Sequence, residues 1–274
     1  MLIDRMKDKI VIITGASSGI GKALAYEFGI KGAKVVLAAR NLAKLNEVTS
    51  DLHKLGIQAL VVQTDVTIEN DCRILVEKTL EKFGRIDILI NNAGISMRAL
   101  FIDLQLDVMR RLMDTNYWGT VYCTKYAIPH LLKSGGSLVG VISIGGYIGM
   151  PGRSGYAASK FAVRGFLDTI RVENRKTGLH VLVVAPGFTT SNIRRAALLA
   201  DGSPQGETPR DEDHMMSAEK VASLVYKAVV KRKRQLVLTF FQGKLTVLVG
   251  KIFPRLVDKQ VYRTFAKEPD SPLK

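Results

Sequence analysis

The chain has few of the residues that mark a disulfide-stabilised or membrane-spanning protein. Cys72 and Cys123 are its only cysteines in 274 residues. Both fall in segments with a helical pattern, and no paired spacing indicates a disulfide framework, so we expect a reducing compartment, the cytoplasm. No run approaches the roughly 18–20 apolar residues that a spanning helix needs. Residues 1–9 are mixed in charge and lead directly into a β-branched run, so we expect no secretory signal.

Acidic residues are scarce at the carboxyl end. Between Lys220 and Lys267 there are twelve Lys or Arg residues and one acid, Asp258, so this segment carries +11 of the formal net charge of +15. The rest of the chain is close to neutral. The charge therefore marks a basic carboxyl-terminal extension, about residues 231–274, and does not describe the whole protein.

Short apolar, β-branched runs alternate with helical patterns. The runs expected as strands are residues 9–14, 33–39, 59–63, 86–90, 138–142 and 180–185. The segments expected as helices are 22–31, 41–53 capped by Asn41, 67–83 capped by Thr67, 104–132 with a break allowed, and 156–176. This alternation predicts an α/β fold with a doubly wound, Rossmann-like parallel sheet covered on both faces. We expect one domain over residues 1–274, with a short helical lid at about 188–213.

Ser143, Tyr156 and Lys160 are candidate catalytic residues. Tyr156 and Lys160 are four residues apart in a helical segment, so their side chains share one face. A nearby ammonium favours phenolate, and Lys160 is therefore expected to lower the Tyr156 pKa from its usual value of about 10. Such a phenol can exchange a proton with an alcohol oxygen. Ser143 follows the run 138–142, at the sheet edge where open α/β sheets bind ligands. Taken alone, a Tyr-x-x-x-Lys pair is more typical of a helix surface.

The glycine turn after the first strand is a candidate cofactor site. Gly15, Gly19 and Gly21 open the first helix, where backbone N–H groups can reach a pyrophosphate. The alternative is an ordinary tight connection. Arg40 ends the second strand with no acid beside it, and a cation there suits the 2′-phosphate of NADP(H). The alternative for Arg40 is a helix-capping or surface role.

These motifs, in this order, resemble the short-chain dehydrogenase/reductase family along nearly the whole chain. The matching motifs are residues 14–21, Asp65, Asn91-Asn92-Ala93-Gly94, Asn116, Ser143, Tyr156-x-x-x-Lys160 and Pro186-Gly187 with Thr189. The segment from Arg234 departs from the closing motif of many soluble members. It looks more like the branch that contains 11β-hydroxysteroid dehydrogenase and related lipid or carbonyl reductases.

The resemblance implies a role for each matching residue. Tyr156 would be the general acid or base, and Lys160 would lower its pKa and bind the nicotinamide ribose. Ser143 would hydrogen-bond the substrate oxygen, and Asn116 would hold a proton-relay water. Asp65 would contact adenine. The residues expected to bind NADP(H) are Gly15, Ser17, Ser18, Gly19, Ile20, Gly21, Arg40, Asp65, Val66, Asn92, Ala93, Gly94, Tyr156, Lys160, Pro186, Gly187 and Thr189, and no metal site is indicated.

The basic extension allows three interpretations. Its apolar residues can belong to a last strand and terminal helices that pack on the domain or form a subunit interface, which is the favoured one. The extension can instead rest on an anionic membrane and deliver a lipophilic substrate. Nucleic-acid binding is least favoured, because no binding motif accompanies the cluster Lys231-Arg232-Lys233-Arg234.

The sequence thus predicts an NADP(H)-dependent oxidoreductase that acts on a carbonyl or secondary alcohol. An apolar ketone is expected as substrate, because Tyr147, Ile148, Met150, Phe188 and Ile193 fall near the expected mouth of the site. We expect a homodimer or homotetramer. The alternative from another class is a catalytically idle NADP-binding regulator, against which the intact catalytic set argues.

Overall fold

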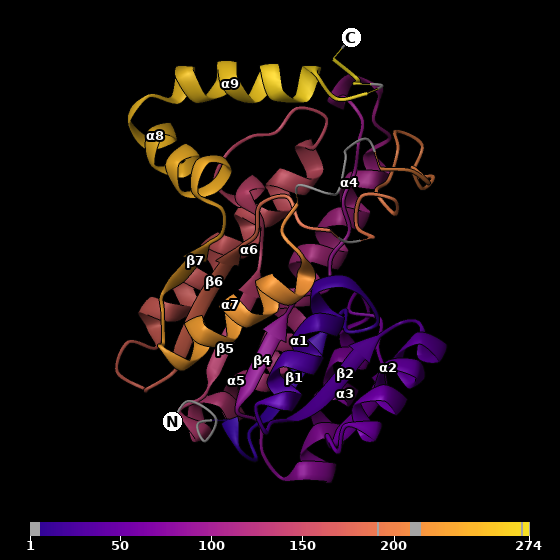
Figure 1. Cartoon of the computed structure of the whole chain (residues 1–274), viewed down its shortest axis with the longest axis vertical. Coiled ribbons are helices and arrows are strands. Elements are labelled where there is room, and N and C mark those ends of the chain that lie inside the picture. Colours follow the sequence, from indigo (N-terminus) through magenta and orange to yellow (C-terminus); the bar gives the residue numbers. More distant parts are fainter. Residues whose placement is uncertain (1–5, 191, 209–214, 270, 274) are drawn as a thin grey trace.

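The computed structural model describes residues 6–190, 192–208, 215–269 and 271–273. Its core is a seven-stranded sheet of parallel pairs in the order β3-β2-β1-β4-β5-β6-β7 (Figure 1). The strands are β1 (Ile10–Thr14), β2 (Lys34–Ala39), β3 (Ala59–Gln63), β4 (Ile88–Asn91), β5 (Ser137–Val141), β6 (His180–Ala185) and β7 (Gln235–Val237). The order runs outward from β1 in both directions, which confirms the predicted doubly wound, Rossmann-like fold. The crevice for ligands in such sheets lies at the carboxyl ends of β1 and β4, where the order reverses.

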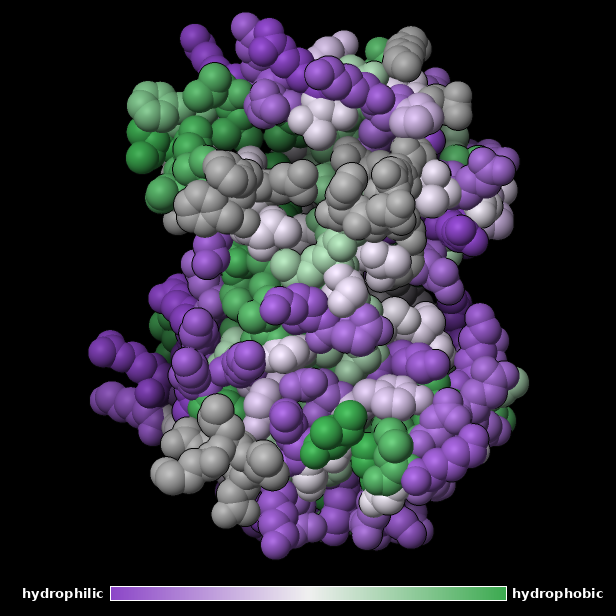
Figure 2. Space-filling view, in the orientation of Figure 1, coloured by the Kyte–Doolittle hydropathy of each residue, from purple (hydrophilic) through white to green (hydrophobic). Residues whose placement is uncertain are grey.

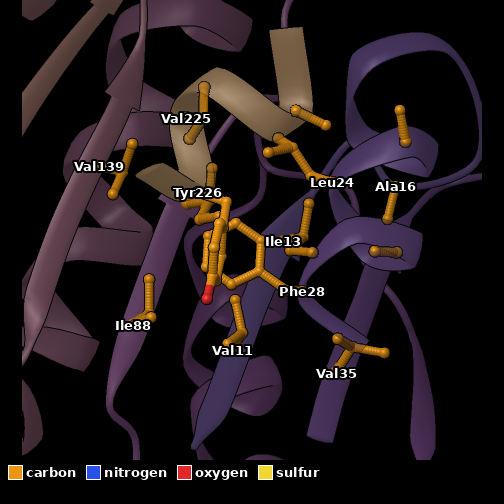
Figure 3. Packing of buried hydrophobic residues seen from close by; sticks show 14 of the residues in the cluster. Val11, Ile13, Ala16, Leu24, Phe28, Val35, Ile88, Val139, Val225 and Tyr226 are labelled. Carbon is orange, nitrogen blue, oxygen red and sulfur yellow. The ribbon is translucent and has the colours of Figure 1, made fainter. Parts of the chain in front are cut away.

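Helices cover both faces of the sheet. One face carries α1 (Gly19–Ile30), α2 (Leu42–Lys54) and α7 (Ala218–Val230), and the other carries α3 (Glu69–Phe83), α5 (Gly119–Ser134) and α6 (Ser154–Glu173). Figure 3 shows the packing on the first face, where the rings of Phe28 and Tyr226 meet edge to face with centroids 5.7 Å apart.

The alternation of side chains along β1 explains why its first four residues, 10–13, are all apolar. Val11 and Ile13 belong to the core under α1 and α7, whereas Ile10 and Ile12 belong to the core under α3 and α5. Successive residues of a strand point to opposite faces, so a sheet covered on both sides needs an apolar residue at every position. The register of Val11 with Val35 of β2 keeps both sets of side chains aligned.

Two helix starts test the capping expectations. The Asn41 side chain accepts a hydrogen bond from the backbone N–H of Lys44 at 3.0 Å, which confirms the predicted cap of α2. The predicted cap by Thr67 is wrong, because α3 begins one residue later with Ile68 at the N-cap position. The Thr67 hydroxyl donates instead to Asp65 Oδ1 at 2.8 Å. The Asp65 side chain forms an Asx turn with the residues that follow it. The bond from the Thr67 hydroxyl to Asp65 therefore competes with capping of α3 by the same hydroxyl.

The long segment after β4 contains several helix types. A 3₁₀ turn, η2 (Phe101–Asp103), precedes α4 (Leu106–Leu112), which continues without interruption through the π-helix η3 (Met113–Trp118) into α5. The break that the sequence allowed in 104–132 is therefore a local widening of a continuous helix. Short π-helical stretches occur frequently at functional sites, and this one contains Asn116.

The lid region differs from its prediction. The described part of residues 188–213 forms hydrogen-bonded turns over 192–196 instead of a regular helix. One of these turns joins the Ala196 N–H to the Asn192 carbonyl at 3.0 Å. Residues 191 and 209–213 of the expected lid lie outside the described residues.

The basic extension forms a strand and terminal helices. β7 pairs with β6 at the sheet edge, and the chain continues through the π-helix η5 (Phe240–Leu245) into α8 (Thr246–Ile252) and α9 (Pro254–Ala266). Figure 1 shows α9 lying across the carboxyl end of the sheet and reaching back toward the region of α4. No helix among the described residues is both long and apolar enough to cross a bilayer.

Candidate active site

Ser143 and Tyr156 meet at the carboxyl end of the sheet. Ser143 follows β5 by two residues and caps the short 3₁₀ helix η4 (Ile144–Gly146), where its Oγ accepts a bond from the Gly145 N–H at 3.2 Å. Its side chain also hydrogen-bonds the phenol of Tyr156. Tyr156 is buried on the first turns of α6. The structure therefore brings together the two predicted residues that would contact a substrate oxygen.

The electrostatics of Tyr156 correct the sequence-based expectation. Burial raises the pKa of the phenol above its ordinary value of 10.0, and the Ser143 hydrogen bond and the charge of Arg153 oppose that increase. The predicted lowering by Lys160 is wrong for this arrangement, because the Lys160 Nζ lies 5.8 Å from the centre of the Tyr156 ring and donates to the Val141 carbonyl at 3.0 Å. The phenol is consequently protonated at neutral pH and holds a proton that it can give, although the raised pKa makes it a weaker acid than a free tyrosine.

Lys160 is almost fully buried. Desolvation lowers its pKa to about 8, because the charged ammonium has lost most of its water. A methyl group added at Gly94 would lie 3.2 Å from Lys160 Nζ and 3.0 Å from Asn116 Oδ1. Only a glycine thus leaves room for the chain to pass beside the ammonium.

Asn116 ties the active-site elements together. Its Oδ1 accepts from the Ile95 N–H at 2.8 Å, while its Nδ2 donates to the Ile95 carbonyl at 3.0 Å and to Ser159 Oγ at 2.9 Å. These bonds join η3 to the loop after β4 and to α6. The side-chain amide therefore has a positioning role in the structure, and the proton-relay role implied for Asn116 stays a prediction.

A cavity of about 390 Å³ opens in front of Ser143 and Tyr156. The predicted residues Lys160, Pro186, Gly187 and Thr189 line it, together with Ile148, Met150, Phe188 and Ile193 from the expected mouth. Tyr147 is not among the lining residues. The Arg164 guanidinium lies over the Tyr147 ring instead, with its central carbon 4.0 Å from the ring centroid. The wall of this cavity is largely apolar.

The glycine turn is fixed to the end of β4. The Thr14 hydroxyl accepts from the backbone N–H groups of Asn92 and Ala93, both at 3.0 Å, and Asn92 Nδ2 donates to the Thr14 carbonyl at 2.9 Å. Gly15 has φ +66°, and an added Cβ would lie 2.9 Å from Ala93 Cα. Backbone geometry and close packing thus both require glycine there.

A second cavity, of about 320 Å³, lies over the glycine turn. It brings together the predicted cofactor residues Gly15, Ser17, Ser18, Gly19, Ile20, Arg40, Asp65, Val66, Asn92, Ala93 and Gly94. Arg40 is exposed, and its Nη1 lies 4.0 Å from Asp65 Oδ2. Ile20, Asn92, Gly94 and Ile193 line both cavities, so the two form one continuous cleft.

One predicted cofactor residue lies outside the cleft lining. A Cβ added at Gly21 would meet the Gly15 carbonyl oxygen at 2.2 Å. Gly21 therefore allows α1 to pack against its own turn, and neither cavity is lined by it. The turn, the N-terminus of α1 and the space beside Gly94 fit a dinucleotide, because they leave backbone N–H groups accessible to a pyrophosphate.

Sequence reasoning missed several lining residues. Arg153, three residues before Tyr156, is buried, donates to the Met97 carbonyl and contributes positive charge to the phenol. Its spacing of three residues from Tyr156 could have indicated that Arg153 lines the same cavity. Arg194 is also buried and donates to the Thr189 carbonyl at 2.9 Å and to Thr208 Oγ1 at 3.2 Å. Ser96, Val141, Ile142 and Ile144 also line the cavity, and the extension contributes Thr246, Gln260, Val261, Thr264 and Phe265.

Comparisons with known proteins agree with this architecture. The family described as short chain dehydrogenase matches residues 9–200. The chain is 38% identical over 258 residues to "Dehydrogenase/reductase SDR family member 7B" of Rattus norvegicus, covering 92% of this chain and 79% of that protein. It is 35% identical over 283 residues to "11-beta-hydroxysteroid dehydrogenase A" of Arachis hypogaea, covering 99% and 80%. The chain belongs to the short-chain dehydrogenase/reductase family, a family of oxidoreductases.

Solved structures show the same fold. A short-chain dehydrogenase/reductase from Burkholderia phymatum in complex with NAD superposes with a TM-score of 0.81 at 21% identity, covering 93% of this chain and 96% of that one. An alcohol dehydrogenase from Thermococcus sibiricus complexed with 5-hydroxy-NADP gives 0.74 at 22% identity, covering 84% and 94%. One of these proteins is bound to NAD and the other to an NADP derivative, so the fold is compatible with either nucleotide.

Proposed function

We propose that the protein is an NADP(H)-dependent oxidoreductase that reduces an apolar ketone to a secondary alcohol. The observation that carries this proposal is the continuous cleft, in which the Ser143–Tyr156 pair faces a largely apolar cavity that joins the glycine-turn cavity at Gly94. Bound NADPH would supply the hydride to the carbonyl carbon.

The protein's own groups supply the proton and the orientation. Tyr156 gives its phenolic proton to the carbonyl oxygen, a role supported by its position beside Ser143 in the lining of the cavity. The Ser143 hydroxyl donates a hydrogen bond to the same oxygen and polarises the carbonyl. Lys160 lies beside Gly94, a residue shared by the two cavities, and would hold the nicotinamide ribose with its ammonium. The remaining proposed cofactor contacts are those that line the second cavity.

The choice of NADP(H) is supported by Arg40. It lines the second cavity and extends into solvent beside Asp65, so its guanidinium can pair with a 2′-phosphate at the rim. The direct test of the whole proposal is to follow NADPH oxidation with purified protein and a series of ketones of increasing apolar size. Turnover that improves with apolar size supports it. Nucleotide binding with no turnover of any ketone would favour the regulator instead.

A homo-oligomer is part of the proposal. Aromatic side chains lie on η3, α5 and α6. The rings of Trp118 and Tyr122 stack with centroids 5.6 Å apart, and Trp118 and Phe161 are exposed. Aromatic residues of this kind are enriched at subunit interfaces. Light scattering should give a dimer or tetramer, and the Trp118→Ser variant should dissociate it.

We also propose peripheral contact with an anionic membrane, at a surface defined by Leu248, Ile252, Phe253 and Leu256 and called here the α8–α9 corner. These side chains are 59% to 65% exposed. Figure 2 shows hydrophobic atoms gathered over α8 and the start of α9. An apolar patch this concentrated marks an interaction surface.

The positive charges around the α8–α9 corner favour an anionic lipid surface as its binding partner. Exposed Lys244, Arg255 and Lys259 flank it, and the only acid in residues 244–267 is Asp258. Two copies that met at this corner would bring the same flanking cations together, whereas anionic lipid headgroups would be attracted to them. The cluster Lys231-Arg232-Lys233-Arg234 lies before β7, at the opposite end of that strand, and is not part of this surface. A cytoplasmic location, peripheral to a membrane, is proposed accordingly.

A further inference from the structure

The carboxyl-terminal helix forms part of the substrate cavity. Gln260, Val261, Thr264 and Phe265 of α9 line the cavity of about 390 Å³. Figure 1 shows that α9 lies across the carboxyl end of the sheet. Ser143 and Tyr156 line the same cavity. The position of α9 therefore decides the size and shape of the space available to a substrate.

Packing alone holds α9 weakly. Of its thirteen residues, only Val257 and Phe265 are buried. A helix of this length is marginal in water, and most helical stability in proteins comes from the burial of an apolar face. With so small a buried face, α9 needs a further contact to keep its carboxyl-terminal half over the cavity.

An ion pair just beyond α9 provides that contact. Arg98 Nη2 lies 3.7 Å from Glu268 Oε2, and the two side chains are only 10% and 4% exposed. The same Nη2 donates to the Pro269 carbonyl at 2.6 Å. A charge-assisted bond of this length is strong, and the burial of the pair makes the loss of one partner costly.

Arg98 is itself fixed to the catalytic wall. Its backbone N–H donates to the Leu198 carbonyl at 2.8 Å, and its neighbours Met97 and Ala99 are buried in one apolar cluster with Tyr156. The Ala99 N–H donates to the Gly152 carbonyl at 3.1 Å. A Cβ added at Gly152 would lie 3.2 Å from Pro272 of the terminal segment. The segment around Pro272 therefore packs against the loops that contain Ala99 and Gly152, which flank the site.

We propose that Arg98 and Glu268 form a latch that positions α9 over the substrate cavity and thereby sets the affinity for large apolar ketones. Both are positioning residues, because neither lines the cavity. The inference rests on the proposed reductase activity for its kinetic consequence, but the position of α9 can be measured without turnover.

The test is a double-mutant cycle with Arg98→Gln, Glu268→Gln and the double variant. Each single change should raise the KM for a long-chain alkyl methyl ketone by about ten-fold, the size expected for a contacting pair. Cyclohexanone is too small to need contact with α9. Its kcat should therefore stay within about two-fold, the scatter expected between independent sites. The double variant should be no worse than Arg98→Gln, because that change alone already removes the ion pair and the bond to the Pro269 carbonyl.

Hydrogen exchange supplies the readout that does not depend on activity. In Glu268→Gln, the amides of residues 259–267 should exchange faster while those of α6 stay unchanged. The control is Glu77→Gln, which removes the exposed ion pair of Arg73 and Glu77 on α3 and should alter neither readout. Unchanged exchange in α9 would overturn the latch, as would single effects on KM that multiply in the double variant. If wild type reduces no ketone, the reductase proposal fails, and the exchange measurement still decides the latch.

Discussion

The Lys160 ammonium lies over the Tyr156 ring, with Nζ 5.8 Å from the ring centre, and donates to the Val141 carbonyl at the end of β5. The helix spacing brings the two residues to one face, but the ammonium bonds the Val141 carbonyl and not the phenol. In this arrangement each group is shifted by its own burial, the phenol upward in pKa and the ammonium downward.

The first prediction concerns the pH dependence of stability. The pKa of Lys160 is lowered from 10.5 to about 8 in the folded protein. Between these values the unfolded chain binds a proton that the folded chain does not, so the contribution of Lys160 to stability rises with pH across this window. Below about pH 8 the burial of the charge lowers stability by a constant amount.

Lys160→Met removes this titration. In denaturant unfolding of the nucleotide-free protein, the variant should be the more stable below pH 8, because its side chain fills the site without a charge. Its advantage should shrink by about 1.4 kcal/mol per unit of pH from 8 upward. A difference between variant and wild type that stays constant from pH 7 to 10 would contradict the buried, shifted ammonium.

The second prediction concerns the cofactor. A charged contact to a phosphate contributes about 1.5–3 kcal/mol, so wild type should bind NADPH roughly ten- to a hundred-fold more tightly than NADH. Arg40→Asp should erase or invert this preference in a fluorescence titration. Arg175→Asp, an exposed change in the turn that follows α6, should leave it intact. Equal affinity of wild type for the two nucleotides would refute the role of Arg40.

The third prediction concerns the space beside Lys160. Gly94→Ala places a methyl group 3.0 Å from Asn116 Oδ1 and 3.2 Å from Lys160 Nζ. Overpacking of this kind costs about 1–3 kcal/mol, and part of that cost should appear as weaker NADPH binding. Gly165→Ala on the exposed side of α6 meets no atom within 4 Å and serves as the control. The idea fails if both variants bind NADPH as wild type does.

The fourth prediction concerns the α8–α9 corner. Wild type should sediment with phosphatidylserine-containing vesicles at low salt, release at high salt and ignore neutral vesicles. Phe253→Ser together with Leu248→Ser should abolish retention. Replacing Lys231, Arg232, Lys233 and Arg234 with Gln should have a smaller effect, because that cluster lies at the other end of β7. Failure of anionic vesicles to retain wild type at low salt would end the membrane proposal.

Local patterns predicted the sheet and most of the site. The runs at 59–63 and 180–185 coincide with β3 and β6. β6 is buried along its whole length, as a continuous apolar run predicts, whereas β3 is an edge strand in which only Val62 is buried. Ser143 and Tyr156 could be placed together because one follows a strand and the other opens the next helix, and consecutive elements of this fold meet at one sheet edge.

What escaped prediction depends on long-range contacts or on competition between local bonds. The bond from Arg98 to the Pro269 carbonyl spans 171 positions, and no periodicity connects the two. The pKa of Tyr156 depends on burial and on the Val141 carbonyl that holds Lys160, neither of which the helix spacing encodes. Thr67 could bond forward as a cap or back to Asp65, and only the folded loop selects the second.

The central claim is that Tyr156 donates the proton in an NADPH-dependent ketone reduction. The most direct measurement is the rate of NADPH oxidation by Tyr156→Phe, beside Tyr262→Phe as an exposed control that also loses one phenol hydroxyl and does not line the cavity. The account predicts a fall of roughly a hundred- to ten-thousand-fold in kcat for Tyr156→Phe, with NADPH binding kept and the control unaffected. Wild-type-like turnover of an apolar ketone by Tyr156→Phe would contradict it.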